Sequence, residues 1–262
     1  MIPKIIHYCW FGKGSIPAYL QECIDTWHKN MPNYQFKCWS ENNFNICMST
    51  YVKEAYENKK YAFVSDYVRI FALYNYGGIY LDTDVIVKDK FDNFLSNKFV
   101  SGVEWHKDIF EKNHSKELLD TEGKRKDKNI MDVRGCGILA AVMMSEANVC
   151  LLKDILDYYD NSYFINEDGS FNLIVSPAIY AACAEKYGFR YKDEEQHFGN
   201  GFSVFPSSVF SVKETASDKT IALHIGNGSW EDDVTILKKI SRFLKRFKIT
   251  NKLYKFLKQI PK

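Results

Sequence analysis

The chain of 262 residues is long enough for one large domain or two small ones, and its hydrophobic fraction of 46% is that of a globular protein that can bury a core. The formal net charge of +2 hides a basic end, because residues 238–262 hold ten Lys or Arg and no acid, so that the preceding 237 residues carry 25 basic and 33 acidic side chains, a net of −8. The acidic main part argues against a nucleic-acid-binding protein, and no run reaches the ~18 uninterrupted apolar residues of a membrane span.

The N-terminus and the cysteines indicate the cellular compartment. Residues 1–4 lead directly into a strand-like run without the apolar region of a secretory signal, so we expect a cytoplasmic protein. The seven cysteines are scattered and form no C-x-x-C pair, which argues against a disulfide framework and against structural zinc. We expect them to be reduced thiols in the core.

The first part of the chain alternates between strand and helix patterns. Period-two and period-3.6 spacings of apolar residues, interrupted by proline and glycine, mark the boundaries of these elements. The predicted elements are a buried strand at residues 4–10, a loop at 12–14, a helix from Pro17 to Pro32, a strand at 34–38, a helical pattern at 46–57 and a helix at 65–76.

The helix at residues 65–76 leads into the most informative segment. Gly77-Gly78 supplies the helix stop, and a short apolar strand, Ile79-Tyr80-Leu81, ends in Asp82 and Asp84 before it continues as Val85-Ile86-Val87. Alternation of strands and helices predicts an α/β fold with a mainly parallel sheet, whose ligands gather at the carboxyl ends of the strands.

The second half has weaker patterns. Residues 98–103 and 137–142 predict strands, residues 148–159 predict a helix, and Ser176-Pro177 predicts the start of another. Residues 107–128 are charged and show no sustained period, so we expect a mobile loop that could cover a site.

Asp82 and Asp84 are candidate metal ligands. If the strand continues through them, the side chains alternate and both carboxylates point to the same face. Two such carboxylates suit Mg²⁺ or Mn²⁺, which keep open positions for substrate phosphates. A solvated turn after the strand is the alternative interpretation.

Two other segments are ambiguous by themselves. Asp66 and Arg69 share one face of a helix, either as an intrahelical ion pair or as a carboxylate and a guanidinium that bind a sugar. Residues 224–230 follow an apolar run, and they form either a tight turn or a glycine-rich loop that binds a phosphate, with His224 as a metal ligand.

Together, these segments resemble glycosyltransferase family 32, the sugar transferases with an Asp-x-Asp sugar-binding region. The matching blocks are IPKIIHYCWFG at residues 2–12, SDYVRIFALYNYGGIYLDTD at 65–84 and HIGNGSW at 224–230. The middle block is the specific one, and its order also resembles the glucosylating domains of large bacterial toxins. The resemblance implies an α/β fold of the GT-A type, with a mixed, mainly parallel sheet flanked by helices.

The resemblance also implies an activity and roles for individual residues. The enzyme would transfer a hexose from a nucleotide sugar with retention at the anomeric carbon. Asp82, Asp84 and His224 would hold Mn²⁺ or Mg²⁺ against the diphosphate, and Asp66 and Arg69 would hold the donor sugar. The other implied donor-binding residues are His7, Trp10, Gly12, Ser65, Thr83, Ser229 and Trp230, with Trp10 beside the nucleotide base and the last two on the phosphates.

The substrates follow only by analogy with small bacterial relatives. That analogy favours a UDP-sugar donor and a saccharide acceptor, a lipid-linked oligosaccharide of bacterial surface polysaccharide synthesis. Residues 174–177, Ile-Val-Ser-Pro, stand where relatives show a Gly-Pro motif on the acceptor side. Residues 104–200 are therefore expected to set the choice of acceptor.

Residues 235–262 are expected to form a basic amphipathic helical tail behind a catalytic domain at residues 1–234. Apolar residues recur at helical spacing among lysines and arginines, from Ile240 to Ile260. Such a tail would bind an anionic membrane, at the inner face of the plasma membrane, or would pack on the domain with a solvated basic face.

Two other functions remain open. A haloacid dehalogenase-like phosphatase also has a strand that ends in Asp-x-Asp, with the first Asp as nucleophile, and residues 231–233 could supply its distal acids. In that class the motif lies on the first strand, and the motifs at 65–69 and 229–230 would be unexplained. A non-catalytic sugar- or nucleotide-binding module would have no reason to retain both carboxylates together with His224.

Overall fold

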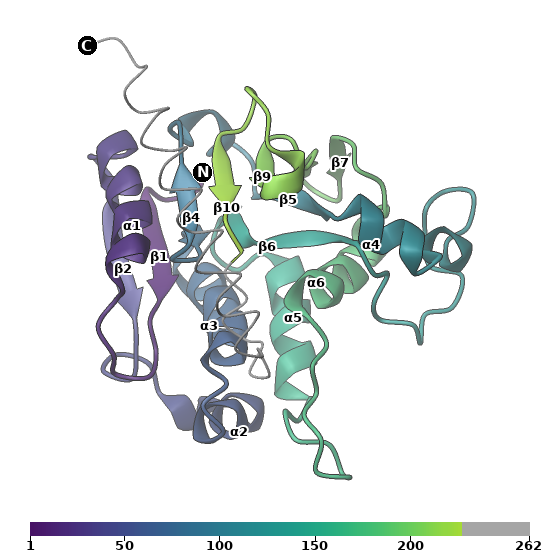
Figure 1. The fold of residues 1–262 in the computed structure, drawn as a ribbon, viewed down its shortest axis with the longest axis horizontal. Helices are drawn as coiled ribbons and strands as arrows, with labels where there is room; N and C mark the ends of the chain where they lie inside the picture. Colours follow the sequence, from purple (N-terminus) through teal and green to yellow (C-terminus); the bar gives the residue numbers. More distant parts are fainter. Residues whose placement is uncertain (227–262) are drawn as a thin grey trace, which may run out of the picture. The chain divides into compact units, whose positions relative to one another are not determined.

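The computed structural model describes residues 1–226, which contain a seven-stranded sheet and a three-stranded sheet (Figure 1). The strands are β1 (Ile5–Cys9), β2 (Gln35–Trp39), β3 (Gly78–Leu81), β4 (Val85–Val87), β5 (Phe99–Trp105), β6 (Cys136–Ser145), β7 (Gln196–Phe198), β8 (Phe202–Phe205), β9 (Phe210–Val212) and β10 (Ala222–His224). The order in the large sheet is β2-β1-β3-β6-β5-β8-β7, and that in the small sheet is β4-β10-β9.

The large sheet is mixed. Its pairings make β1, β2, β3, β5 and β8 run in one direction and β6 and β7 in the other. The predicted α/β class with a mixed, mainly parallel sheet is therefore confirmed. Because β1, β3 and β5 run in the same direction, their carboxyl ends lie at one edge of the sheet.

Helices cover the sheet on both faces. The α-helices are α1 (Ala18–Asn30), α2 (Thr50–Glu57), α3 (Tyr61–Tyr76), α4 (Lys107–Lys112), α5 (Cys150–Asp160) and α6 (Ser176–Ala184). Buried side chains of α2, α3, α5 and α6 form one core against the sheet, and those of α1 and the small sheet form a second core on the other face. Within residues 1–226, no helix has the length and apolar character needed to cross a membrane.

Two glycines set the path from α3 into β3. Gly77 and Gly78 have φ angles of +62° and +108°, which residues with a side chain rarely adopt. A Cβ atom on Gly78 would lie 2.6 Å from the carbonyl oxygen of Ile5. The glycine pair therefore ends the helix, as the sequence predicted, and allows β3 to pack directly beside β1.

The prediction that residues 85–87 continue β3 is wrong. A turn at Thr83 and Asp84 separates the two strands, and the N–H of Val85 donates to the carbonyl of Asp82 at 3.0 Å. β4 then leaves the large sheet and pairs antiparallel with β10. Its residues are apolar in either sheet, so the local pattern could not distinguish the two arrangements.

Residues 107–128, which were predicted to be a mobile loop over a site, contain regular structure instead. This segment contains α4, a 3₁₀ helix (Ser115–Leu118) and an isolated bridge between Leu119 and Arg125. The buried guanidinium of Arg125 pairs with Glu185 at 2.8 Å. Since this anchor comes from 60 residues further along the chain, it left no local period to detect.

The seven cysteines are free, as predicted, but they do not all lie in the core. Cys47 and Cys150 are exposed. The basic tail and the domain boundary predicted at residues 234 and 235 lie outside the described residues.

Candidate functional site

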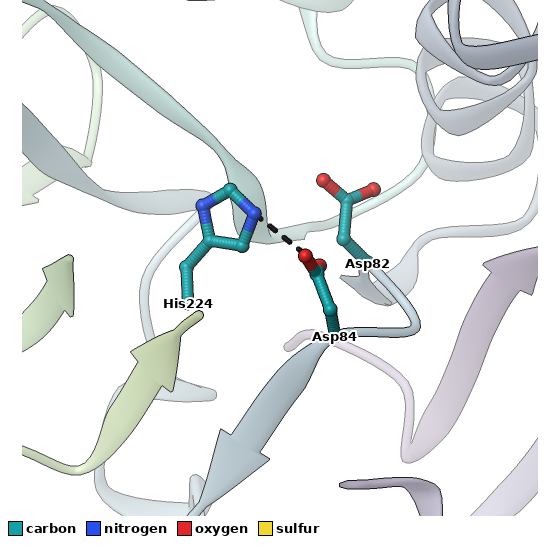
Figure 2. A group of neighbouring side chains, drawn as sticks. All are labelled: Asp82, Asp84 and His224. Carbon is teal, nitrogen blue, oxygen red and sulfur yellow. Dashed lines mark ion pairs between the residues drawn. The ribbon is translucent and has the colours of Figure 1, made fainter. Parts of the chain in front are cut away.

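Asp82, Asp84 and His224 come together where β3, β4 and β10 meet (Figure 2). The antiparallel pairing of β4 with β10 sets His224 opposite Val85, and the N–H of Ile225 donates to the carbonyl of Asp84 at 3.1 Å. The two aspartates are thus brought together by a turn, and not by the strand alternation expected from the sequence. The departure of β4 from the large sheet is what carries His224 to this turn.

The three side chains offer a compact set of ligand atoms. One ligand atom from each residue lies within 4.8 Å of the other two, and His224 Nε2 is 3.3 Å from Asp84 Oδ1. Burial alone would lower the pKa of His224, but Asp84 and Asp82 raise it to about 9. Two carboxylates and one imidazole can hold a divalent cation and leave positions for other oxygen ligands.

Arg69 joins the metal-ligand group to a second acidic residue. Its Nη2 lies 2.9 Å from Asp66 Oδ1 and 3.2 Å from Asp82 Oδ1, and its guanidinium carbon is 4.8 Å from the centre of the Tyr80 ring. The hydroxyl of Tyr80 donates to Asp82 Oδ1 at 2.9 Å. One oxygen of Asp82 is therefore fixed by two partners from α3 and β3.

Asp66 is held from α6 as well as from its own helix. Ser176 Oγ donates to Asp66 Oδ1, and Tyr180 Oη donates to the Asp66 carbonyl, each at 3.0 Å. Burial raises the pKa of Asp66 to about 6, although the charge of Arg69 opposes this shift. Asp66 and Arg69 thus form the predicted pair, but it is buried and tied to the metal-ligand group, unlike a surface ion pair.

The candidate donor-binding residues of the N-terminal block, residues 2–12, lie in different environments. His7 is fully buried, its Nε2 lies 2.9 Å from the Gly77 carbonyl, and its Nδ1 accepts from the Trp39 indole at 3.2 Å. Burial lowers the pKa of His7 to about 4. Both of its nitrogens are occupied inside the protein, so it positions β1 and cannot contact a nucleotide in this structure.

Trp10 and Gly12 lie in the loop after β1, at the sheet edge where β3 also ends. The Trp10 indole N–H donates to the Gly14 carbonyl at 2.6 Å, and the Gly12 N–H donates to Glu41 Oε1 at 2.5 Å. These hydrogen bonds hold the loop beside the end of β2. The loop therefore lies at the same edge of the sheet as Asp82.

The remaining predicted residues are placed differently from one another. Ser65 Oγ donates to the Tyr61 carbonyl at 3.0 Å, inside α3, and Thr83 is partly exposed in the turn between the two aspartates. Ser229 and Trp230 lie outside the described residues.

Several residues at this edge were not predicted from the sequence. Tyr80 could have been, because it stands two residues before Asp82 and so faces the same side of β3. Ser176 and Tyr180 act on Asp66 across more than 100 residues of chain, and no local signal reveals this. Glu104 and His106, at the end of β5, were also not predicted.

Part of the chain is similar to known glycosyltransferases. Residues 17–100 match the model of the glycosyltransferase sugar-binding region containing the DXD motif. Inositol phosphoceramide mannosyltransferase 3 of Schizosaccharomyces pombe is 36% identical over 92 residues, which cover 32% of this chain and 24% of the relative. The uncharacterized glycosyltransferase L373 of Acanthamoeba polyphaga mimivirus is 35% identical over 109 residues, which cover 38% of this chain and 42% of the relative.

The chain thus spans about a quarter of the first relative and less than half of the second. Among solved structures, the PaToxG glycosyltransferase is 16% identical, with a TM-score of 0.47 over 71% of this chain and 69% of that one.

Proposed function

We propose that this chain, which carries the sugar-binding region of the DXD glycosyltransferases, is a metal-dependent retaining enzyme that moves a hexose from a nucleotide sugar to a saccharide acceptor. One observation carries the proposal. Asp82 belongs at once to the group of three metal-ligand residues and to the network of Arg69 and Asp66. The site therefore combines groups for a diphosphate with groups for a sugar.

The two parts of the site suit the two parts of a nucleotide sugar. Asp82, Asp84 and His224 would hold Mn²⁺ or Mg²⁺, which when bound stabilises the negative charge that develops on the leaving diphosphate. Asp66 and Arg69 can accept from and donate to the hydroxyl groups of the donor hexose. Their buried, mutually paired arrangement keeps both side chains in one orientation before the sugar arrives.

The phosphatase alternative is less well supported. In that class the Asp-x-Asp motif follows the first strand, whereas Asp82 and Asp84 follow β3, and Asp82 Oδ1 is engaged by Arg69 and Tyr80. Asp84 is paired with His224 at 3.3 Å. These contacts favour a role as a metal anchor that attacks nothing itself, so the acceptor would attack the same face of the sugar that the diphosphate leaves.

A donor screen tests this function. UDP-hexoses are the preferred donors by analogy, and GDP-mannose is the second arm because relatives are named as mannosyltransferases. In a thermal-shift assay with Mn²⁺, one nucleotide sugar is expected to raise the unfolding temperature, and above Kd the rise should follow the logarithm of its concentration. A chain that responds to none of these donors, with or without Mn²⁺, would contradict the proposal.

Metal affinity should depend on pH through His224. An ion can bind only the neutral imidazole, and the raised pKa of about 9 means that a proton must leave on binding. Apparent affinity for Mn²⁺ should therefore rise up to about tenfold per pH unit between about pH 6.5 and 8.0, measured by titration calorimetry. A His224→Asn variant should bind Mn²⁺ more weakly, and its affinity should depend much less on pH. If the affinity of the unaltered chain depended on pH as little as that of the variant, His224 would be ruled out as a ligand.

The acceptor and the cellular location are proposed from the sequence. We place the enzyme in the cytoplasm at an anionic membrane surface, with residues 238–262 as the basic contact and a lipid-linked oligosaccharide as the acceptor. The full chain should sediment with phosphatidylglycerol vesicles at low salt and should lose this binding when residues 238–262 are deleted. Unchanged sedimentation after the deletion would refute the role of the tail.

A further inference from the structure

Glu104 and His106 form a polar pair at the carboxyl end of β5, on the same edge of the sheet as Asp82. Glu104 Oε1 lies 3.4 Å from His106 Nε2, and His106 Nδ1 lies 4.0 Å from Glu214 Oε2. The side chains of Glu104 and His106 are 22% and 28% exposed, so both can be reached by a ligand. Neither residue belongs to the metal-ligand group or to the proposed sugar-binding pair of Asp66 and Arg69.

On one side, this pair borders the residues proposed to bind the sugar. Glu104 is paired with Gly137 of β6, and a Cβ atom on Gly137 would lie 2.7 Å from the Pro177 carbonyl oxygen. Pro177 follows Ser176, which donates to Asp66. The start of α6 thus lies close to Gly137, the strand partner of Glu104, and its first residue, Ser176, binds Asp66.

On the other side, the pair borders the metal-ligand group. Glu214, the neighbour of His106, follows β9 by two residues, and Val212 at the end of β9 is paired with His224. Burial is the main cause of the raised pKa of Asp66, and Glu104 adds to it; Glu104 also adds to the raised pKa of His224. The charge of Glu104 therefore acts on both halves of the site.

This position has a chemical meaning if the proposed function holds. The bond that breaks joins the sugar, beside Asp66 and Arg69, to the diphosphate, beside the metal-ligand group. An attacking hydroxyl must approach next to that bond, and it needs a hydrogen-bond acceptor that directs its lone pair toward the anomeric carbon. Within residues 1–226, Glu104 is an accessible carboxylate that lies between the two halves without being fixed to either.

We propose that Glu104, oriented by His106, is the acceptor-side group of this site: its carboxylate accepts a hydrogen bond from the hydroxyl that attacks the donor sugar. It takes the proton of that hydroxyl as the hydroxyl oxygen bonds to the anomeric carbon and the bond to the diphosphate breaks. His106 is a positioning residue that holds the carboxylate through Nε2. Glu104 forms no bond to the sugar. The assignment rests on the proposed transferase function and names the residues that present the acceptor to the donor.

Hydrolysis of the donor tests this assignment without knowledge of the natural acceptor, because water then takes the place of the attacking hydroxyl. Glu104→Gln and Glu104→Ala should lower kcat for Mn²⁺-dependent hydrolysis of a UDP-hexose, or of GDP-mannose if that donor binds, at least about tenfold. His106→Gln should lower kcat less. The donor KM should stay within about threefold of that of the unaltered chain, because Glu104 does not hold the donor. For the same reason, the donor-induced thermal shift should be unchanged.

His114→Gln is the matched control, since His114 also pairs with a glutamate, Glu117 at 3.6 Å, but on the surface. It should match the unaltered chain. An unchanged kcat in both Glu104 variants would overturn the assignment, and so would a raised donor KM at unchanged kcat, which would make Glu104 a donor contact. If the unaltered chain neither binds nor hydrolyses any donor, the proposed function fails, and this assignment fails with it for a separate and recognisable reason.

Discussion

Replacing Asp82 and Asp84 together by asparagine is expected to abolish metal-dependent turnover of the nucleotide sugar, with a loss of about 10³-fold or more. The amide side chains keep the size of the carboxylates but remove both negative charges that would hold the cation. Because Asp82 and Asp84 lie in a partly exposed turn, the fold should persist. Turnover with and without Mn²⁺, together with the circular dichroism spectrum, measures both outcomes.

Asp89→Asn is the control for this double variant. Asp89 lies only five residues after Asp84 and is exposed. Its carboxylate accepts a hydrogen bond from the N–H of Lys90. This change should leave turnover and metal affinity unaltered. Full turnover in the double variant would exclude the two aspartates as the metal anchor.

Arg69→Met is expected to destabilise the protein by about 3–5 kcal/mol and to remove turnover. Arg69 is only 4% exposed and neutralises Asp66 and Asp82 at 2.9 and 3.2 Å. Methionine fills similar space but leaves the two carboxylates beside each other without a cation. Urea denaturation gives the change in the free energy of unfolding, and donor hydrolysis gives the change in activity.

Arg134→Met provides the comparison. Arg134 pairs with Asp132 at 3.6 Å, but its side chain is 67% exposed, so its loss should cost less than about 1 kcal/mol. If the Arg69 variant were as stable as the Arg134 variant, the carboxylates could not depend on the guanidinium. Arg69→Lys should recover part of the stability but not the simultaneous contact with both acids, because a single ammonium lacks the planar fork.

Local chemistry explains which features could be predicted from the sequence. The helix α3, the glycine stop and the aspartates after β3 lie within one segment, so periodicity and turn residues were sufficient. The same reasoning placed β1, α1 and β2 within a few residues of their observed bounds.

Contacts between distant segments explain what could not be predicted. The pairing of β4 with β10 brings His224 to Asp84 across 140 residues. The local pattern offered a metal ligand only as one of two interpretations of His224, and the family resemblance joined it to Asp82 and Asp84. The hydrogen bond from Ser176 to Asp66 spans 110 residues. His7 was misassigned because a histidine in a strand has the same sequence signature whether it faces a ligand or, as here, the Trp39 indole and the Gly77 carbonyl.

The most direct test of the proposed function is to identify what the chain releases from a nucleotide sugar. Purified protein should convert a UDP-hexose, or GDP-mannose, to free hexose and the nucleoside diphosphate in a reaction that requires Mn²⁺ or Mg²⁺ and stops when the ion is chelated. Release of inorganic phosphate from a generic phosphomonoester, with no nucleoside diphosphate formed from any nucleotide sugar, would contradict the transferase assignment and favour a phosphatase.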